Sequence, residues 1–105
     1  MTDYVVILVT ASSESEAETI AKALVEERLA ACVNVISPIR SLYRWEGKVT
    51  GDREWLLLIK TRAERFSAVE ARVKALHSYQ VPEVIALPIV ASAEGYLRWL
   101  RDETN

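Results

Sequence analysis

The segment Ala31–Thr61, ACVNVISPIRSLYRWEGKVTGDREWLLLIKT, places the strongest constraint on the fold of this chain. Apolar and polar residues largely alternate over Cys32–Trp45, and Glu54–Thr61 is apolar on both faces, so both parts are predicted strands. The residues between them, 46–52, hold two of the three glycines and predict the turn of a long β-hairpin. Pro38 cannot donate to a sheet ladder and predicts a bulge, a bend or an edge position.

One further strand is expected on each side of this hairpin. Residues 4–10 (YVVILVT) form a β-branched run that is typical of a central strand. Residues 84–90 (VIALPIV) form a second apolar run, in which Pro88 indicates an edge strand or a bulge.

Three helices are predicted from apolar residues that recur at helical spacing. The first covers residues 14–30, the second residues 62–78, and a short third one residues 93–103. We expect side-chain caps at all three starts, formed by Ser13 with Glu16, by Thr61 with Glu64, and by Ser92.

The resulting order is β-α-β-β-α-β with a terminal helix, in a single domain spanning residues 1–105. Two interleaved right-handed crossovers of this kind predict an α+β, ferredoxin-like sandwich with helices on one face of the sheet. Residues 4–9 and 56–59 are apolar on both faces, so the opposite face of the sheet also needs a cover.

The length of the hairpin predicts an oligomer. At about 3.3 Å per residue, Cys32–Trp45 would extend roughly 45 Å, whereas a domain of this size is roughly 33 Å across. The overhang carries apolar residues such as Leu42 and Val49, and we expect it to contact a neighbouring copy within a closed ring. Alternatively, Pro38 folds the arm back over its own sheet.

Composition narrows the function classes. Thirteen basic and fifteen acidic residues give a net charge of −2, which argues against nucleic acid as a partner. The start of the chain lacks a basic region, and no apolar run is long enough for a membrane span, so neither a signal peptide nor membrane insertion is expected. The single cysteine, Cys32, cannot form an internal disulfide and favours a reducing, cytoplasmic setting.

The residues that could carry chemistry are few. His77 is the only histidine, which excludes an internal histidine pair, and it is more typical of a hydrogen-bonded residue at a helix end. Cys32 by itself is predicted to be a buried, inert thiol. A copper or zinc shell would need both, together with a carboxylate such as Glu83 or symmetry. Without an assignable nucleophile–base pair we do not expect an enzyme, and Tyr43, Trp45 and Trp55 are expected at an interface or a ligand cleft.

Several motifs resemble one known family, the CutA family. They cover nearly the whole chain in order: LAACVNV (29–35), SLYRWEGKV (41–49), the strand 54–61 ending in KT, HSYQVPEV (77–84), LPI (87–89) and YLRWL (96–100). The resemblance implies a ferredoxin-like homotrimer that exchanges hairpin strands, and a role in divalent-cation tolerance with copper, Cu(II), as the ion most often invoked.

The resemblance carries the metal site over only in part. Cys32 and His77 match the family pattern, but Val9 stands where copper-binding members have a cysteine, and Leu76 where they can have a second histidine. The trimeric ferredoxin-like architecture is also similar to that of the PII signalling proteins, which bind small effectors between subunits. A PII-like regulatory or scaffolding trimer without a strong metal site is therefore the alternative.

Overall fold

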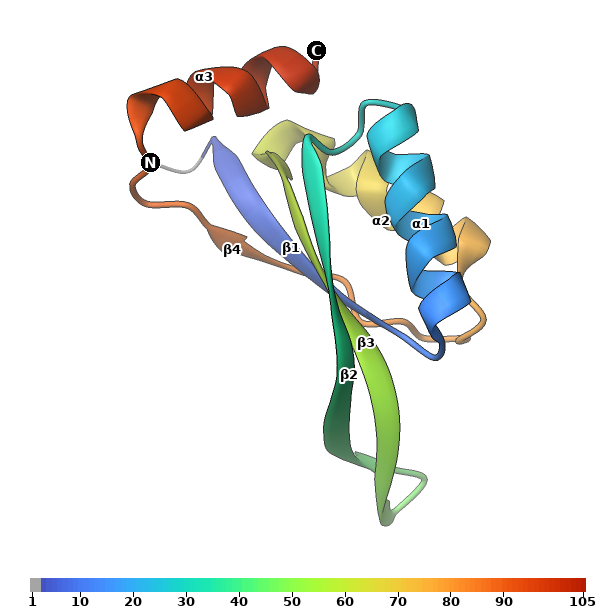
Figure 1. Cartoon of the computed structure of the whole chain (residues 1–105). Coiled ribbons are helices and arrows are strands. Elements are labelled where there is room, and N and C mark those ends of the chain that lie inside the picture. The colour runs from blue at the N-terminus through green and yellow to red at the C-terminus, as the bar shows by residue number, and fades with distance from the viewer. Residues whose placement is uncertain (1–2) are drawn as a thin grey trace.

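Strand β3 (Lys48–Arg62) is the longest element of this computed structural model, which describes residues 3–105. It pairs with β2 (Cys32–Trp45) on one side and with β1 (Tyr4–Ala11) on the other, and β4 (Ile85–Pro88) completes an antiparallel sheet in the order β2-β3-β1-β4 (Figure 1). This confirms the ferredoxin-like α+β fold. Among the described residues, no helix is long and apolar enough to cross a membrane.

The hairpin of β2 and β3 projects well beyond the rest of the sheet (Figure 1). The chain measures 44 × 25 × 23 Å along its principal axes, so the predicted overhang is present. The register of β2 against β3 shifts between Ile36 and Ile39, which confirms a bulge at Ser37–Pro38. The arm is not folded back over its own sheet.

The turn of this hairpin is shorter than the predicted loop over residues 46–52. Trp45 already pairs with Lys48, which leaves only Glu46 and Gly47 between the strands. Both residues have positive φ angles, 49° and 78°, as a two-residue hairpin turn of this handedness requires. The prediction was wrong because Gly51, taken as a turn residue, lies within β3 opposite Leu42.

Two helices cover one face of the sheet. Helix α1 (Glu14–Glu26) and helix α2 (Phe66–Leu76) lie side by side there (Figure 1). The core between these helices and the sheet consists of fully buried aliphatic side chains, among them Ile7, Ile20, Leu57, Ile59 and Val73.

The opposite face of the sheet carries apolar side chains that the chain itself covers incompletely. Val6, Leu8, Leu56 and Leu58 are only half-buried in the two inner strands. Their cross-strand partners Ile36 on β2 and Ile85 and Leu87 on β4 lie on the same face and are 42 to 51% exposed. The predicted need for a second cover is therefore not met within one chain.

Both long helices are shorter than predicted. Helix α1 ends at Glu26 rather than at residue 30, because Arg28 takes a left-handed conformation, with φ of 60°, and the amides of Leu29 and Ala30 both bond to the Leu24 carbonyl. Residues 63–65 form a separate 3₁₀ turn before α2, which ends at Leu76 rather than at residue 78.

Only one of the three expected caps forms. Ser13 accepts the amide of Glu16, but the Glu16 carboxylate reaches back to the amide of Ser12 rather than to that of Ser13. Thr61 is fully buried and donates to the carbonyl of Leu29 instead of capping a helix. Helix α3 (Glu94–Glu103) begins without a side-chain cap, since the Ser92 hydroxyl donates to the Ala93 carbonyl.

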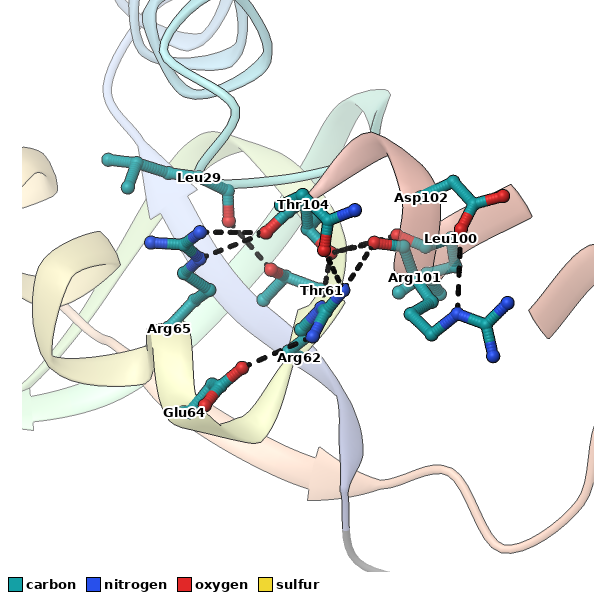
Figure 2. A network of polar contacts seen from close by, with 10 residues as sticks. Leu29, Thr61, Arg62, Glu64, Arg65, Leu100, Arg101, Asp102 and Thr104 are labelled. Atoms are coloured by element: carbon teal, nitrogen blue, oxygen red, sulfur yellow. Dashed lines mark hydrogen bonds and ion pairs between the residues drawn. The ribbon is translucent and has the colours of Figure 1, made fainter. Parts of the chain in front are cut away.

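Helix α3 is fastened at its C-terminal end by two arginines (Figure 2). Arg65 donates twice to the carbonyl of Thr104, at 2.8 and 3.1 Å, and Arg62 donates to the Thr104 hydroxyl and to the carbonyl of Arg101. Thr104 is completely buried, and its hydroxyl donates a hydrogen bond to the carbonyl of Leu100. The helix C-terminus thus gains the positive charge that its dipole favours.

The fourth strand is shorter than the predicted residues 84–90. It pairs with β1 over Ile85–Pro88 only, opposite Val5–Leu8. Its position at the edge of the sheet agrees with the interpretation of Pro88.

Replacing Glu16 by glutamine should lower the free energy of unfolding by about 1 to 2 kcal/mol at pH 7, since one carboxylate accepts the amides of both Ser12 and Ser78. Burial raises the pKa of Glu16, but those hydrogen bonds more than offset it and leave the pKa below 4.5. The contribution is present above pH 4.5 and is lost as the pH falls through the lowered pKa. The free energies of unfolding of wild type and Glu16→Gln should therefore converge as the pH falls. Urea unfolding of both proteins from pH 7 to pH 3 measures this.

The exposed residue Glu18 on the same helix provides the control. Glu18→Gln should match the wild type at every pH. If Glu16→Gln lowers the free energy of unfolding as much at pH 3 as at pH 7, the role of the carboxylate charge is contradicted.

Replacing Thr104 by valine should destabilise the fold by about 1 to 3 kcal/mol, because the Arg62 Nε–H loses its buried acceptor. Thr104→Ser retains the hydroxyl and should recover most of this loss. Thermal unfolding of the three proteins makes the comparison, and equal losses in both variants would show that the threonine methyl group, not the hydrogen bond, matters.

Candidate functional site

A cleft of about 720 Å³ lies where the hairpin leaves the sheet. Strand β1 pairs with β3 only as far as Trp55, and beyond that residue β2 and β3 continue alone. The cleft is lined by the end of β1, by both hairpin strands and by the segment after α2, through Thr10, Arg40, Ser41, Leu42, Tyr43, Trp45, Glu54, Tyr79, Gln80, Val81 and Glu83.

Glu54 is a buried carboxylate in this cleft. It is 7% exposed, and its Oε2 atom accepts a hydrogen bond of 2.8 Å from the Tyr79 hydroxyl. Within residues 3–105, its Oε1 atom has no hydrogen-bond partner and no basic side chain forms an ion pair with Glu54. Oε1 is not among the enclosed polar atoms that lack a partner, so it keeps contact with solvent and is available to a ligand.

A second carboxylate, Glu83, lines the same cleft. The residue as a whole is solvent-exposed, but partial loss of water around its carboxyl group, and then the negative charge of Glu54, raise its pKa. Partial burial and the hydrogen bond to Glu54 also raise the pKa of Tyr79. With raised pKa values, Glu83 and Tyr79 both hold their protons more tightly than in water.

Aromatic side chains of the hairpin form the outer wall. Tyr43 and Trp45 line the cleft and are 39 and 53% exposed. The Tyr43 hydroxyl donates to Asp52, and this hydrogen bond raises the pKa of Tyr43. The structure thus places Tyr43 and Trp45 beside a cleft, and their contact with a ligand or a neighbouring copy stays a prediction.

Trp55 does not line the cleft. It is half-buried and packs against the core, and its indole nitrogen is buried without a hydrogen-bond partner among the described residues. Its place on the core face follows from the strand alternation, which puts it on the same side as Leu57 and Ile59.

His77 holds Tyr79 in position. The side chain is fully buried, its Nε2 atom lies 2.7 Å from the Thr10 carbonyl, and its Nδ1 atom lies 3.0 Å from the amide of Tyr79. Because the carbonyl can only accept and the amide can only donate, the ring is neutral with its proton on Nε2. The two rings also pack at 4.6 Å.

The three residues expected to hold a metal do not come together in one chain. Cys32 pairs with Lys60, and the carbonyl that His77 contacts belongs to Thr10, which pairs with Leu56. Those pairs are four positions apart along β3, roughly 13 Å. Glu83 lines the cleft, and both ring nitrogens of His77 are already engaged.

A copper centre built on these residues therefore does not fit the single chain. Among residues 3–105, no three histidine, cysteine or acidic side chains lie close enough to share an ion. Val9, where the resemblance implies a cysteine in copper-binding members, is a fully buried core residue, and Leu76 packs against the same core.

Sequence reasoning missed the two residues at the centre of the cleft. Glu54 is predicted only as the start of a strand, and Tyr79 occurs only within the motif of residues 77–84. The available signal was a carboxylate directly before five apolar residues, because a charge at the start of an inner strand needs a structural or functional explanation.

The chain matches the family model described as CutA1 divalent ion tolerance protein over residues 5–103. It is 57% identical over 100 residues to the divalent-cation tolerance protein CutA of Thermus thermophilus, covering 95% of this chain and 97% of that protein. It is 46% identical to the chloroplastic CutA of Arabidopsis thaliana over 96% of this chain, but spans only 56% of that protein.

Solved structures of the same name have the same fold. The divalent cation tolerance protein from T. thermophilus superposes with a TM-score of 0.95 at 55% identity, covering 97% of this chain and 99% of that one. CutA1 from Oryza sativa gives 0.96 at 45% identity, covering 99% and 95%. The protein therefore belongs to the CutA1 divalent ion tolerance family.

Proposed function

We propose that this protein acts in divalent-cation tolerance as a homotrimeric binding module, with its ligand in the cleft at the base of the hairpin. The observation that carries the proposal is the buried Glu54 carboxylate, which has one oxygen bonded to Tyr79 and the other without a partner among residues 3–105. The volume of the cleft, about 720 Å³, lies in the range of small-molecule sites.

The apolar face of the sheet that the chain leaves uncovered supports assembly. One face leaves Ile36, Ile85 and Leu87 exposed, and the hairpin leaves Leu42 and Val49 about 70% exposed. Apolar residues gathered on one sheet face and on a projecting ribbon favour contacts with further copies of the chain. We propose three copies, as the resemblance to the family implies.

A binding role is favoured over catalysis by the state of His77. The only histidine of the chain is enclosed and engaged at both ring nitrogens, so it has no free nitrogen with which to act as a general base. We propose a reducing, cytoplasmic location on the basis of the single free thiol of Cys32. Relatives carry other locations in their names, periplasmic for Archaeoglobus fulgidus and chloroplastic for A. thaliana.

Direct copper binding at His77 is the second candidate function, and the description of the family as divalent ion tolerance proteins is compatible with it. A metal at either ring nitrogen would have to displace the Thr10 carbonyl or the Tyr79 amide. A soft ligand, Cys32, is present, but at another place on the sheet.

Light scattering after gel filtration should give about three times the chain mass of 11.8 kDa. Leu87→Glu places a charge on the exposed apolar face and should shift the mass toward a single chain. Ala75→Glu, at an exposed position on α2, is the matched control and should keep the mass of the wild type. A monomeric wild type would refute the assembly.

Calorimetric titration with Cu(II) separates the two candidate functions. Because His77 is engaged within the fold, wild type and His77→Ala should give the same weak isotherm, and Cys32→Ser should match them. Tight binding that His77→Ala abolishes, in a variant whose far-UV spectrum and trimeric mass are unchanged, would establish the copper site instead.

A further inference from the structure

The cleft has an unbalanced charge. Two carboxylates, Glu54 and Glu83, line it, and Asp52 lies beside it as the acceptor of the Tyr43 hydroxyl. Arg40 is the one basic side chain in the lining; it is solvent-exposed and faces a like charge across the hairpin, Arg53. The ion pairs formed among residues 3–105 include neither Glu54 nor Glu83.

We propose that this cleft binds the ammonium group of a small organic amine, with the charged nitrogen at Glu54 and Glu83. The inference rests on the proposed function and names the ligand class of the same site. It is independent of His77 and Cys32, the residues expected to hold a metal.

The protein supplies the acceptors that an ammonium ion needs. An alkylammonium carries three N–H donors, and the Oε1 atom of Glu54 is an acceptor without a partner in the described chain. The carboxylate of Glu83 is a second acceptor close enough for its pKa to respond to the charge of Glu54. A cation between the two carboxylates would relieve their repulsion and form charge-assisted hydrogen bonds.

The walls suit the organic part of such a ligand. Tyr43, Trp45 and Tyr79 line the cleft together with Leu42 and Val81. Aromatic faces attract ammonium groups and the carbon atoms next to them, by about 0.5 to 2 kcal/mol for each well-placed ring. Most of the lining therefore favours a cation that also carries apolar surface.

A bare metal ion fits the cleft less well. The cleft has a volume of about 720 Å³, and even a single water molecule occupies only about 30 Å³. The cleft is therefore far larger than one ion. The Tyr43 and Tyr79 hydroxyls both donate to carboxylates and have raised pKa values, so they remain protonated rather than becoming phenolate ligands. The two carboxylates of the lining are then too few for a closed metal shell.

Calorimetry on the intact oligomer tests the proposal with three probes: n-butylammonium, putrescine and the neutral n-butanol. The two amines should bind and n-butanol should not, although butylammonium and butanol have nearly the same shape. Glu54→Gln and Glu83→Gln should each weaken amine binding at least tenfold, and Tyr79→Phe should weaken it less. Glu18→Gln, at an exposed position on α1, should bind like the wild type.

Glu54 is buried, so a loss of binding in Glu54→Gln counts only when its melting temperature and oligomeric mass match the wild type. Glu83→Gln is the safer variant, since Glu83 is exposed and its replacement leaves the buried contacts intact. Equal binding of butanol and butylammonium, or amine binding that neither glutamine variant weakens, would overturn the proposal.

Failure of the proposal can be separated from failure of the proposed function by a thermal-shift panel of nucleotides, metabolites and divalent metals. If amines do not bind but another ligand stabilises the wild type and not Tyr79→Phe, the cleft is a binding site and only the ligand class is wrong. If nothing in the panel or among the amines binds, the cleft is not a ligand site, and both proposals fail.

Discussion

The pairing of β3 with two strands over five of its fifteen residues, and with one strand over the rest, determines where the other strands and the cleft lie. From Leu56 to Lys60, β3 is held between β1 and β2, and Leu57, Ile59 and the following Thr61 are completely buried on its helix-facing side. From Lys48 to Glu54 it has only β2 beside it. The same strand is therefore a core element at one end and an exposed ribbon at the other.

The cleft forms where this change takes place. Glu54 is the first residue of β3 beyond the reach of β1, and its partner on β2 is Ile39, directly after the bulge. A bulge bends its strand and increases the local twist, so the hairpin leaves the plane of the sheet at this point. The loss of one neighbouring strand and the bend together leave space on the sheet beside Glu54, which the segment 79–83 borders from the other side.

The element order, the bulge and the overhang of the hairpin were all predictable, because they depend on local patterns such as alternation, β-branched runs and the missing donor of Pro38. The turn and the caps were not, because they depend on alternatives that only the folded chain offers. Thr61 forms its hydrogen bond with Leu29, which lies 32 residues away, and Gly51 lies in a strand rather than in a turn. The buried state of Glu54 likewise required knowledge of where β1 stops.

The same limit applies to His77, whose role at a helix end was predicted but whose partners were not. Its Nδ1 atom accepts the amide of Tyr79, and the Tyr79 hydroxyl then donates to Glu54, so a buried ring orients the cleft without lining it. The Glu54 carboxylate is 7% exposed, and among residues 3–105 its one hydrogen bond is from Tyr79 and no basic side chain forms an ion pair with it. Glu54 is thus held by a hydrogen bond, but no basic side chain among residues 3–105 neutralises it. We propose a positively charged ligand as the reason, since a purely structural position could hold an apolar residue at lower cost.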